Sequence, residues 1–403
     1  MSQYKINITF YLILLIVVSL LIVPSCPFLV AIADNKVVDK KISYVGVNVR
    51  GYYTSIQNSR YSTPFPENYY DESFKLISKA GMNHIRYVFY WEAYDRNPTN
   101  FIKEIKKVAT LADKWGLNVL YDSHQFHTSS WLDPKNGTGF PKVLFQNDPQ
   151  TSYRQGGTTV DNAAKVWWTK WWNRNITDNE GNDGWRLYAN FLKKVIKTVN
   201  YHESTLGYKI LNEPQIHSYD QWDKIGKFNS YMSKELRKIT DKTIVYSMNV
   251  PVSFKDTSID LSAKNLAKMA PTDSNNLVFK ISVYGNPIPN TYQGDKLSIL
   301  VNASKIADVP MYIGEWNEVS REEKINENGN YMFQIDPAKS NLTQIKADSL
   351  VKEFKKLDAW GMAFWNWNYV LNPSPNFNLI KVTDHGHIQT TKYFTIIRNV
   401  ISS

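Results

Sequence analysis

The segments "KAGMNHIRY" (79–87) and "KWGLNVLY" (114–121) decide the fold, because each carries the end of a helix directly into a buried strand. In both segments Gly follows a basic or aromatic last helical turn, and Gly tolerates the left-handed conformation that ends many helices. "AWGMAFW" (359–365) repeats this arrangement near the end of the chain. Three recurrences of helix, Gly and strand predict an α/β fold with parallel strands.

Apolar runs of strand length alternate with stretches of helical periodicity eight times along the chain. Eight such units predict a (β/α)8 TIM barrel, whose bare form needs only about 250 residues, so this chain also carries insertions. The alternative is an open doubly wound sheet, but "GVNVRGYY" (46–53) in and after the first strand is not a glycine-rich nucleotide loop. The expected strands are 44–49, 84–90, 117–122, 208–212, 243–249, 277–284, 311–314 and 362–367. The expected helices lie near 71–80, 101–115, 184–201, 220–239, 259–269, 296–307, 343–359 and 391–400.

Two connections are much longer than the others, and both follow expected strands. One occupies 125–183 after the third strand, and the other occupies 317–341 after the seventh. In a barrel these loops lie on the face that carries active sites, where long loops are usually functional. We therefore expect one catalytic domain over 34–403, with long insertions after strands 3 and 7 and no separate binding module.

The N-terminal segment has the pattern of an export signal. Residues 10–23, "FYLILLIVVSLLIV", form an apolar run that Lys5 precedes and "AIA" (31–33) follows. Residues 1–33 are therefore expected to be a signal peptide, and the mature protein is expected to be secreted. An uncleaved N-terminal anchor is the alternative, and a membrane contact is expected only if the segment is retained. Four sequons fit exposed loops outside the cell: Asn136, Asn175, Asn302 and Asn341.

Composition and charge argue against several other classes of protein. The formal net charge is +10, but the basic residues are spread along expected helices, which favours solvated helix faces over a nucleic-acid surface. The single cysteine, Cys26, lies in the leader, so no disulfide is expected in the exported part. His124 and His127 are three residues apart, yet no third ligand pattern accompanies them. We therefore expect neither a metal nor another cofactor.

Polar and aromatic side chains gather at or near the carboxyl ends of the expected strands, where they should converge on one mouth of the barrel. Glu213 directly follows the apolar end of the fourth strand, and Glu315 follows the seventh. A carboxylate in such a place must find a partner or perform chemistry. The complete set is Arg86, Trp91, Glu92, Asp122, His124, Asn212, Glu213, Tyr284, Glu315, Trp365 and Trp367.

Two carboxylates that face each other across a barrel suit the cleavage of glycosidic bonds. One protonates the leaving oxygen, and the other attacks the sugar, or activates water, on the opposite face. The fourth and seventh strands lie on roughly opposite sides of the barrel, so Glu213 and Glu315 are expected to meet across its axis. The glutamate that acts as acid needs a raised pKa, which the second carboxylate and aromatic walls are expected to provide. Arg86 and Tyr284 are expected to hold the other glutamate ionised.

Five short motifs occur in an order that resembles a known family. They are "NHIRYVFYW" (83–91), "SH" (123–124), "LNEP" (211–214), "GEW" (314–316) and "FWNW" (364–367). The chain is similar to the cellulase-type glycoside hydrolases of family 5, within the clan of retaining barrel glycosidases. The resemblance extends over nearly the whole chain after residue 43.

The resemblance implies a role for each matching residue. Glu213 is similar to the acid/base, and Glu315 to the nucleophile that forms a covalent glycosyl-enzyme. Arg86 is similar to the arginine that positions the nucleophile, and Asn212 to the residue that binds the 2-hydroxyl of the sugar. Three further residues resemble those that line the reacting subsite: His124, Tyr284 and, as its aromatic floor, Trp365.

The resemblance also bears on the substrate. Ser282-Val283-Tyr284 stands where the family usually has His-x-Tyr, whereas "SHQFHTSSW" (123–131) and "GFP" (139–141) resemble endoglycoceramidase-like members. The family resemblance implies an endo-β-1,4-glucanase (cellulase), and β-mannan, another β-glucan and glycolipids stay open as substrates. We expect a monomer that acts on a polysaccharide or oligosaccharide.

Structural interpretations stand beside these functional ones. The two glutamates can be ion-pair partners of Arg86, and the protein can be a carbohydrate-binding barrel without catalysis, although such a relative should have lost one glutamate. If "WWTKWW" (167–172) is helical, its tryptophans pair four residues apart, either as a sugar-stacking platform or as packing for the insertion. Three other carboxylates are expected to support neighbours by hydrogen bonding: Glu92, Asp122 and Glu318.

Overall fold

Left-handed glycines join a helix to a strand at two of the three places that the sequence predicts. Gly81 and Gly116 have φ angles of 84° and 64°, and they lead into the buried strands β2 (His84–Phe89) and β3 (Asn118–Ser123). At the third place Gly361 has no positive φ and begins the strand β10 (Gly361–Phe364), while Asp358, with a φ of 54°, takes the left-handed conformation after the helix. The computed structural model describes residues 42–55, 65–135, 137–146, 159–247, 259–272, 275–285, 287, 292–318, 321–325, 331–335, 341–368, 377–383 and 385–402.

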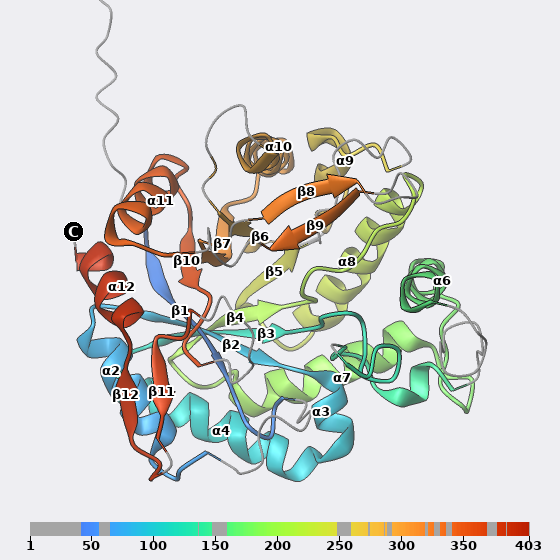
Figure 1. Cartoon of the computed structure of the whole chain (residues 1–403). Helices are drawn as coiled ribbons and strands as arrows, with labels where there is room; N and C mark the ends of the chain where they lie inside the picture. The colour runs from blue at the N-terminus through green and yellow to red at the C-terminus, as the bar shows by residue number, and fades with distance from the viewer. Residues whose placement is uncertain are drawn as a thin grey trace, which may run out of the picture. The chain divides into compact units, whose positions relative to one another are not determined.

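Eight parallel strands close into a barrel in the order β1-β10-β7-β6-β5-β4-β3-β2 (Figure 1). The register places Asn48 of β1 opposite Arg86 of β2, and Arg86 opposite Leu120 of β3. Closure confirms the predicted (β/α)8 TIM barrel and excludes the open sheet. The other barrel strands are β1 (Tyr44–Arg50), β4 (Thr205–Lys209), β5 (Thr243–Ser247), β6 (Leu277–Tyr284), β7 (Met311–Asn317) and β10 (Gly361–Phe364).

Amphipathic helices connect the strands and surround the barrel (Figure 1). In α4 (Pro98–Trp115) the buried residues Phe101, Ile105, Val108 and Ala112 recur every three or four positions, which creates one apolar stripe toward the strands. The other connecting helices are α2 (Tyr69–Lys79), α7 (Gly184–Val199), α8 (Gln221–Arg237), α9 (Ala263–Ala267), α10 (Tyr292–Ala307), α11 (Gln344–Lys356) and α12 (Lys392–Ser402).

The fourth strand differs from its prediction. β4 spans Thr205–Lys209, three residues earlier than the predicted 208–212. A close approach fixes its register, because a Cβ on Gly207 would lie 2.3 Å from the carbonyl oxygen of Thr243 on β5. Asn212 and Glu213 consequently lie in the turn beyond the strand. Glu315, by contrast, lies inside β7, which is longer than predicted.

Both long insertions follow the strands that the sequence names. Between β3 and α7 the chain forms a 3-10 helix, Lys142–Leu144, and the helix α6 (Val160–Trp172). After β7 it forms an antiparallel hairpin of β8 (Arg321–Ile325) and β9 (Tyr331–Ile335). Three further elements also have no counterpart in the sequence prediction: α3 (Trp91–Arg96), β11 (Ile380–Val382) and β12 (Ile388–Thr390).

The four tryptophans of α6 pack the insertion onto the barrel. Trp167, Trp168 and Trp171 are 0% exposed, and Trp172 is 2% exposed. Trp167 stacks on Trp171 and Trp168 on Trp172, with ring centroids 5.1 and 5.2 Å apart. Trp171 and Trp172 also meet the ring of Phe228 on α8, and Figure 1 shows α6 beside α8. The packing interpretation is therefore confirmed and the sugar-stacking platform is wrong, because sealed rings cannot receive a sugar.

Trp167→Ala is expected to lower the free energy of unfolding by about 3–5 kcal/mol, the range for truncating a buried aromatic side chain. Trp167 also packs on Phe140 and Phe145, so its loss leaves a cavity inside the insertion. Urea unfolding followed by circular dichroism measures the change. Ile345→Ala is the control, because Ile345 is 81% exposed and should shift stability by less than about 0.5 kcal/mol. Equal losses in both variants would contradict this account of the core.

The predicted leader, 1–33, lies outside the described residues and stays a prediction. Within the described part of the chain, no helix combines the length and the apolar character needed to cross a bilayer. Three sequon asparagines are exposed, namely Asn175, Asn302 and Asn341, while Asn136 lies outside the described residues.

Candidate active site

The two glutamates singled out by the sequence lie together at the carboxyl end of the barrel. Glu315 lies on β7, opposite Ser282 of β6, and its side chain is 4% exposed. Glu213 lies in the turn after β4, and its side chain is 22% exposed. The carboxylate of Glu315 is thus the more deeply buried of the two, and that of Glu213 is the more exposed.

Three side chains fix the carboxylate of Glu315. Arg86 on β2 contacts Oε1 through Nη1 at 2.9 Å, and Lys280 on β6 contacts the same oxygen at 2.8 Å. The hydroxyl of Tyr284 donates a short hydrogen bond to Oε2. Burial raises the pKa of Glu315, but the charges of Lys280 and Arg86 outweigh burial and hold this pKa well below its ordinary value. Glu315 is therefore ionised at neutral pH.

The turn that presents Glu213 is strained and braced. Glu213 has a φ of 41°, a left-handed conformation that costs a residue other than glycine about 1–2 kcal/mol. Its backbone N–H donates to Ser247 Oγ at 3.2 Å, and that hydroxyl donates to the carbonyl of Leu211 at 3.0 Å. Gln125 Nε2 donates to the carbonyl of Glu213 at 2.7 Å. Strain that neighbours hold in place in this way is typical of functional sites.

Lys280 links the two glutamates. Its side chain is fully buried, and its Nζ lies 3.2 Å from Glu213 Oε1 and 2.8 Å from Glu315 Oε1. Since both oxygens contact one nitrogen, they lie at most about 6 Å apart, the sum of these two distances, which is below the ~6.5–9.5 Å of inverting glycosidases. Ser282 adds a short hydrogen bond from its hydroxyl to Glu213 Oε1.

The pKa of Glu213 contradicts the sequence prediction of a raised value. Burial does raise it, and so does the charge of Glu315. The positive charge of Lys280 and the hydrogen bond from Ser282 outweigh both effects, and the pKa of Glu213 lies below its ordinary value. The prediction is wrong because it placed no cation between the two glutamates.

Arg86 forms the centre of a buried ion network. Its Nη2 contacts Asp122 Oδ2 at 2.7 Å, while Nη1 contacts Glu315. Asn48 on β1 accepts from Nη1 at 2.5 Å and donates through Nδ2 to the carbonyl of Gly314 at 2.9 Å. These partners leave the guanidinium little freedom, so Arg86 holds Glu315 from a fixed position.

The amide of Asn212 is oriented by the guanidinium and amino groups around it. Its Oδ1 accepts from Arg86 Nη2 at 2.8 Å, from Lys280 Nζ at 3.1 Å and, in a short hydrogen bond, from Lys209. Its Nδ2 points the other way and donates to His124 Nε2 at 3.1 Å. Asn212 therefore connects the cation network to the histidine.

His124 is held as a neutral ring by its partners. Nδ1 donates to Asp122 Oδ2 at 2.7 Å, so that Nε2 accepts from Asn212. Burial lowers the pKa of His124 despite the neighbouring Asp122. The ring stacks on Trp365 with centroids 5.7 Å apart. Contacts therefore connect all seven residues predicted for the site: Arg86, His124, Asn212, Glu213, Tyr284, Glu315 and Trp365.

Sequence reasoning missed Lys280, Lys209 and Asn48 as members of this network. A signal was present, because both lysines interrupt apolar strands, in "LVFKISVY" (277–284) and "YKIL" (208–211). A charge inside a buried strand is costly unless it is paired. Such a lysine therefore predicts a buried carboxylate partner.

The remaining carboxylates support neighbours, as expected. Glu92 accepts from Arg96 at 2.7 Å, and Glu318 from Lys346 at 3.1 Å, while Asp122 pairs with Arg86. Within the described segments, no group of three or more His, Cys, Asp or Glu side chains is arranged to hold a metal ion.

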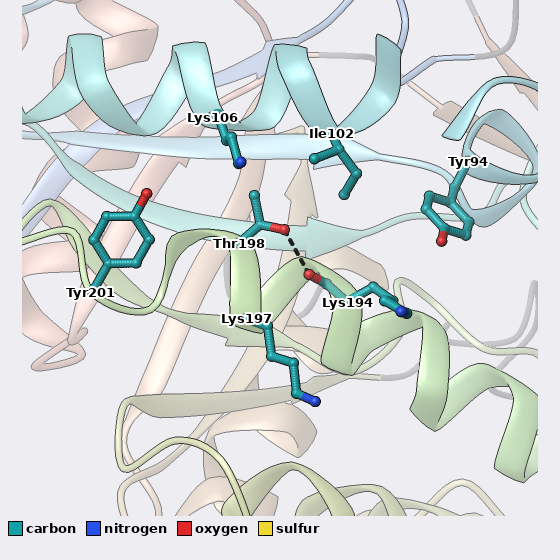
Figure 2. A pocket seen from close by; sticks show the side chains of 7 residues that line it. All are labelled: Tyr94, Ile102, Lys106, Lys194, Lys197, Thr198 and Tyr201. Atoms are coloured by element: carbon teal, nitrogen blue, oxygen red, sulfur yellow. Dashed lines mark hydrogen bonds between the residues drawn. The ribbon is translucent and has the colours of Figure 1, made fainter. Parts of the chain in front are cut away.

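A surface pocket of about 460 Å³ lies between α4 and α7, and no predicted site residue lines it (Figure 2). Figure 2 shows that the amino groups of its three lysines do not converge on one point. This pocket is therefore separate from the candidate active site. Its lining consists of Tyr94, Ile102, Lys106, Lys194, Lys197, Thr198 and Tyr201.

Comparison with protein families and curated proteins gives two matches. The family model described as "Cellulase (glycosyl hydrolase family 5)" matches residues 39–370. An endoglycoceramidase of Hydra vulgaris is 29% identical over 177 residues, which cover 37% of this chain and 32% of the relative. The matched part thus spans about a third of that protein.

Solved structures share the fold at low sequence identity. A crystal structure of endogalactoceramidase has a TM-score of 0.64 at 15% identity, covering 90% of this chain and 81% of the other. Endo-glycoceramidase II from Rhodococcus sp., in a cellobiose-like imidazole complex, has a TM-score of 0.57 at 13% identity over 89% and 79%. XacCel5A in complex with cellopentaose has a TM-score of 0.53 at 17% identity over 89% and 99%.

Proposed function

The chain belongs to glycosyl hydrolase family 5, and from this premise we propose that it is a retaining β-glycosidase with Glu315 as nucleophile and Glu213 as acid/base. The observation that carries the proposal is the contact of both glutamates with Lys280. That contact limits the separation of the two Oε1 atoms to at most about 6 Å, which supports direct attack by a carboxylate.

In the first step Glu315 attacks the anomeric carbon while the proton on Glu213 passes to the leaving oxygen. The bond to the aglycone breaks as the bond to Glu315 forms. Glu315 is prepared for this step because it is ionised and because Arg86 and Lys280 fix its Oε1. Glu213 must carry a proton here, and its lowered pKa means that acidic solution favours this form.

In the second step Glu213 takes a proton from water, and that water attacks the same anomeric carbon. The bond to Glu315 breaks, the sugar leaves, and two inversions at one carbon give net retention. Glu213 suits both steps because its side chain is 22% exposed, so that water and the leaving oxygen can reach it. Trp365, stacked beside His124, offers an aromatic face to the sugar ring.

Glycolipids with a β-linked sugar headgroup are the substrate class that we place first. The 29% sequence identity with an endoglycoceramidase over 177 residues supports this choice. Phe126 and Tyr219 are 49% and 67% exposed on the segments that follow β3 and Glu213, and exposed rings suit an apolar aglycone. β-1,4-Glucan is the second candidate, because the order of the sequence motifs resembles cellulase-type members.

The wild-type protein is expected to release the headgroup of a glycosylceramide, dispersed in detergent, with retention of anomeric configuration. The first product seen by proton NMR should be the β-anomer, because two displacements at one carbon restore the original configuration. Parallel assays on carboxymethylcellulose, β-mannan and xylan rank the other substrates. An α-anomer as first product would overturn the retaining mechanism.

The variant Glu315→Ala serves as the negative control in these assays, because it removes the proposed nucleophile and leaves the rest of the barrel sequence unchanged. Cleavage of carboxymethylcellulose alone would move β-1,4-glucan to first place. Binding of cello-oligosaccharides in isothermal titration, with no new reducing ends from any substrate, would favour the non-catalytic carbohydrate-binding barrel instead.

A further inference from the structure

Lys280 lies at the floor of the site and contacts four side chains there. Besides both glutamates, its Nζ lies 2.6 Å from Ser282 Oγ and 3.1 Å from Asn212 Oδ1. The side chain is fully buried, so its charge receives no help from water. A buried ammonium is tolerated only with such partners, and its effect on nearby carboxylates is strong because little solvent screens it.

The position of Lys280 has a consequence for the two-step reaction. In the ligand-free site its charge is shared between two ionised carboxylates, Glu213 and Glu315. Once the sugar is attached, Glu315 is a neutral ester and Glu213 is the remaining carboxylate in contact with Lys280. The second step needs Glu213 as an ionised base, which is the form that an unshared lysine charge favours.

We propose that Lys280 is a positioning residue that holds both glutamates from below and keeps Glu213 deprotonated after the glycosyl-enzyme has formed, so that it serves as the base of the second step. This inference rests on the proposed retaining mechanism. It assigns Lys280 no direct contact with the substrate, since its action passes through the two carboxylates.

The same contact sets the pH range of the enzyme. Glu315 must be ionised to attack, so its pKa sets the acidic limb of the profile of kcat/KM, while Glu213 must be protonated in the first step, so its pKa sets the basic limb. The charge of Lys280 lowers both pKa values against the effect of burial. Removal of this charge favours both protonated forms, so both limbs should move to higher pH.

Other charged groups also affect the pKa values of the two glutamates, so they must stay unmutated in any test of Lys280. Arg86 also lowers the pKa of Glu315, as does His124 when its ring is protonated, and Lys209 lowers the pKa of both glutamates. The charged and titratable groups that face this cluster are Arg86 on β2, Asp122 on β3, His124 after β3, Lys209 on β4, Glu213 after β4, Tyr284 on β6, and Tyr312 and Glu315 on β7.

Lys280→Met is the central test, because methionine keeps most of the length of the side chain and removes its charge. With a substrate whose leaving group needs protonation, both limbs of the kcat/KM profile should rise by about 1–3 pH units, the usual effect of one adjacent charge. With an aryl glycoside at acidic pH, this variant should also accumulate the glycosyl-enzyme, seen as a burst of phenol and by mass spectrometry. Lys280→Arg keeps the charge and should leave both limbs near those of the wild type.

Ser282→Ala is the matched control on the same strand. It removes the hydrogen bonds that join Ser282 to Glu213 and to Lys280 without removing a charge, and Ser282 forms no hydrogen bond with the carboxylate of Glu315. The basic limb alone should therefore rise in this variant. If Lys280→Met does not fold, Lys280→Gln is a second neutral variant that is assessed by the same two measurements.

The outcomes separate this inference from the proposed function. A wild-type protein that hydrolyses no glycoside would defeat the proposed function itself. Suppose instead that the wild type is active and that the neutral Lys280 variant is slower at every pH. If this variant also shows unmoved limbs and no burst, Lys280 is only structural. Two raised limbs together with a burst, and one raised limb in Ser282→Ala, would establish the positioning role.

Discussion

Glu315→Ala is expected to lower kcat by on the order of 10⁴- to 10⁶-fold on every substrate, the scale seen when a covalent nucleophile is removed. The carboxylate is held by Arg86, Lys280 and Tyr284 in one orientation, and its removal leaves no carboxylate at this position to attack the anomeric carbon. Initial rates on an aryl β-glycoside measure the loss.

Azide gives this variant a distinctive signature. Truncation of Glu315 opens a space beside the anomeric carbon that a small anion can enter, while Glu213 still protonates the leaving oxygen. Azide attacks once from that side, so the product should be a glycosyl azide of inverted configuration. Its formation, followed by NMR, identifies the side from which the wild-type nucleophile attacks.

Glu318→Ala is the control for Glu315→Ala. Glu318 is also a nearly buried glutamate, three residues further along the chain, but it pairs with Lys346. This variant is expected to retain most of its activity and to give no azide product. Comparable losses in both variants, with no rescue by azide, would remove Glu315 from its proposed role.

Glu213 and Glu315 could be identified from the sequence because every parallel barrel brings the carboxyl ends of its strands together. The strand and helix alternation with Gly81 and Gly116 defines parallel units, and the carboxyl ends of such strands converge whatever the details. Residues that lie near those ends, such as Arg86, His124 and Glu315, therefore come together even if a strand boundary is wrong. The three-residue error in β4 lengthened the turn that carries Glu213 without moving Glu213 from the mouth.

Lys280 could not be placed from sequence for a physical reason. Strands of a parallel barrel are covered on both faces, so their residues are apolar throughout and do not alternate. The sequence "LVFKISVY" (277–284) therefore does not reveal which of its residues face the barrel interior. The two glutamates that contact Lys280 lie in the turn after β4 and on β7, and only the folded barrel brings them within hydrogen-bond distance of β6.

The burial of the α6 tryptophans also depends on contacts with residues that are distant in the sequence. The pairs of Trp167 with Trp171 and of Trp168 with Trp172 follow from helical spacing and were predicted. Whether these pairs meet solvent depends on Phe140 before the helix and on Phe228 after it. Local periodicity contains no information about such partners, so sequence alone left the two interpretations open.

Glu213→Ala is expected to behave differently from Glu315→Ala, because the acid/base is lost and the nucleophile is kept. With a glycolipid or glucan, whose leaving oxygen needs a proton, kcat/KM should fall by on the order of 10²- to 10⁴-fold. With an aryl glycoside whose phenol leaves unaided, the first step should be nearly unaffected. The slow second step, which has lost its base, should then produce a burst of phenol followed by accumulated glycosyl-enzyme on Glu315.

Azide again identifies the role, now through the opposite product. In Glu213→Ala the sugar is first attached to Glu315, and azide then attacks from the side that the lost carboxylate has vacated. It needs no general base, so it should restore turnover and yield a glycosyl azide of retained configuration. The basic limb of the pH profile should also disappear, since Glu213 no longer titrates. Each glycosyl azide shows on which face of the sugar the missing carboxylate lay. If Glu213→Ala gave the inverted product and Glu315→Ala the retained one, the two assignments would have to be exchanged.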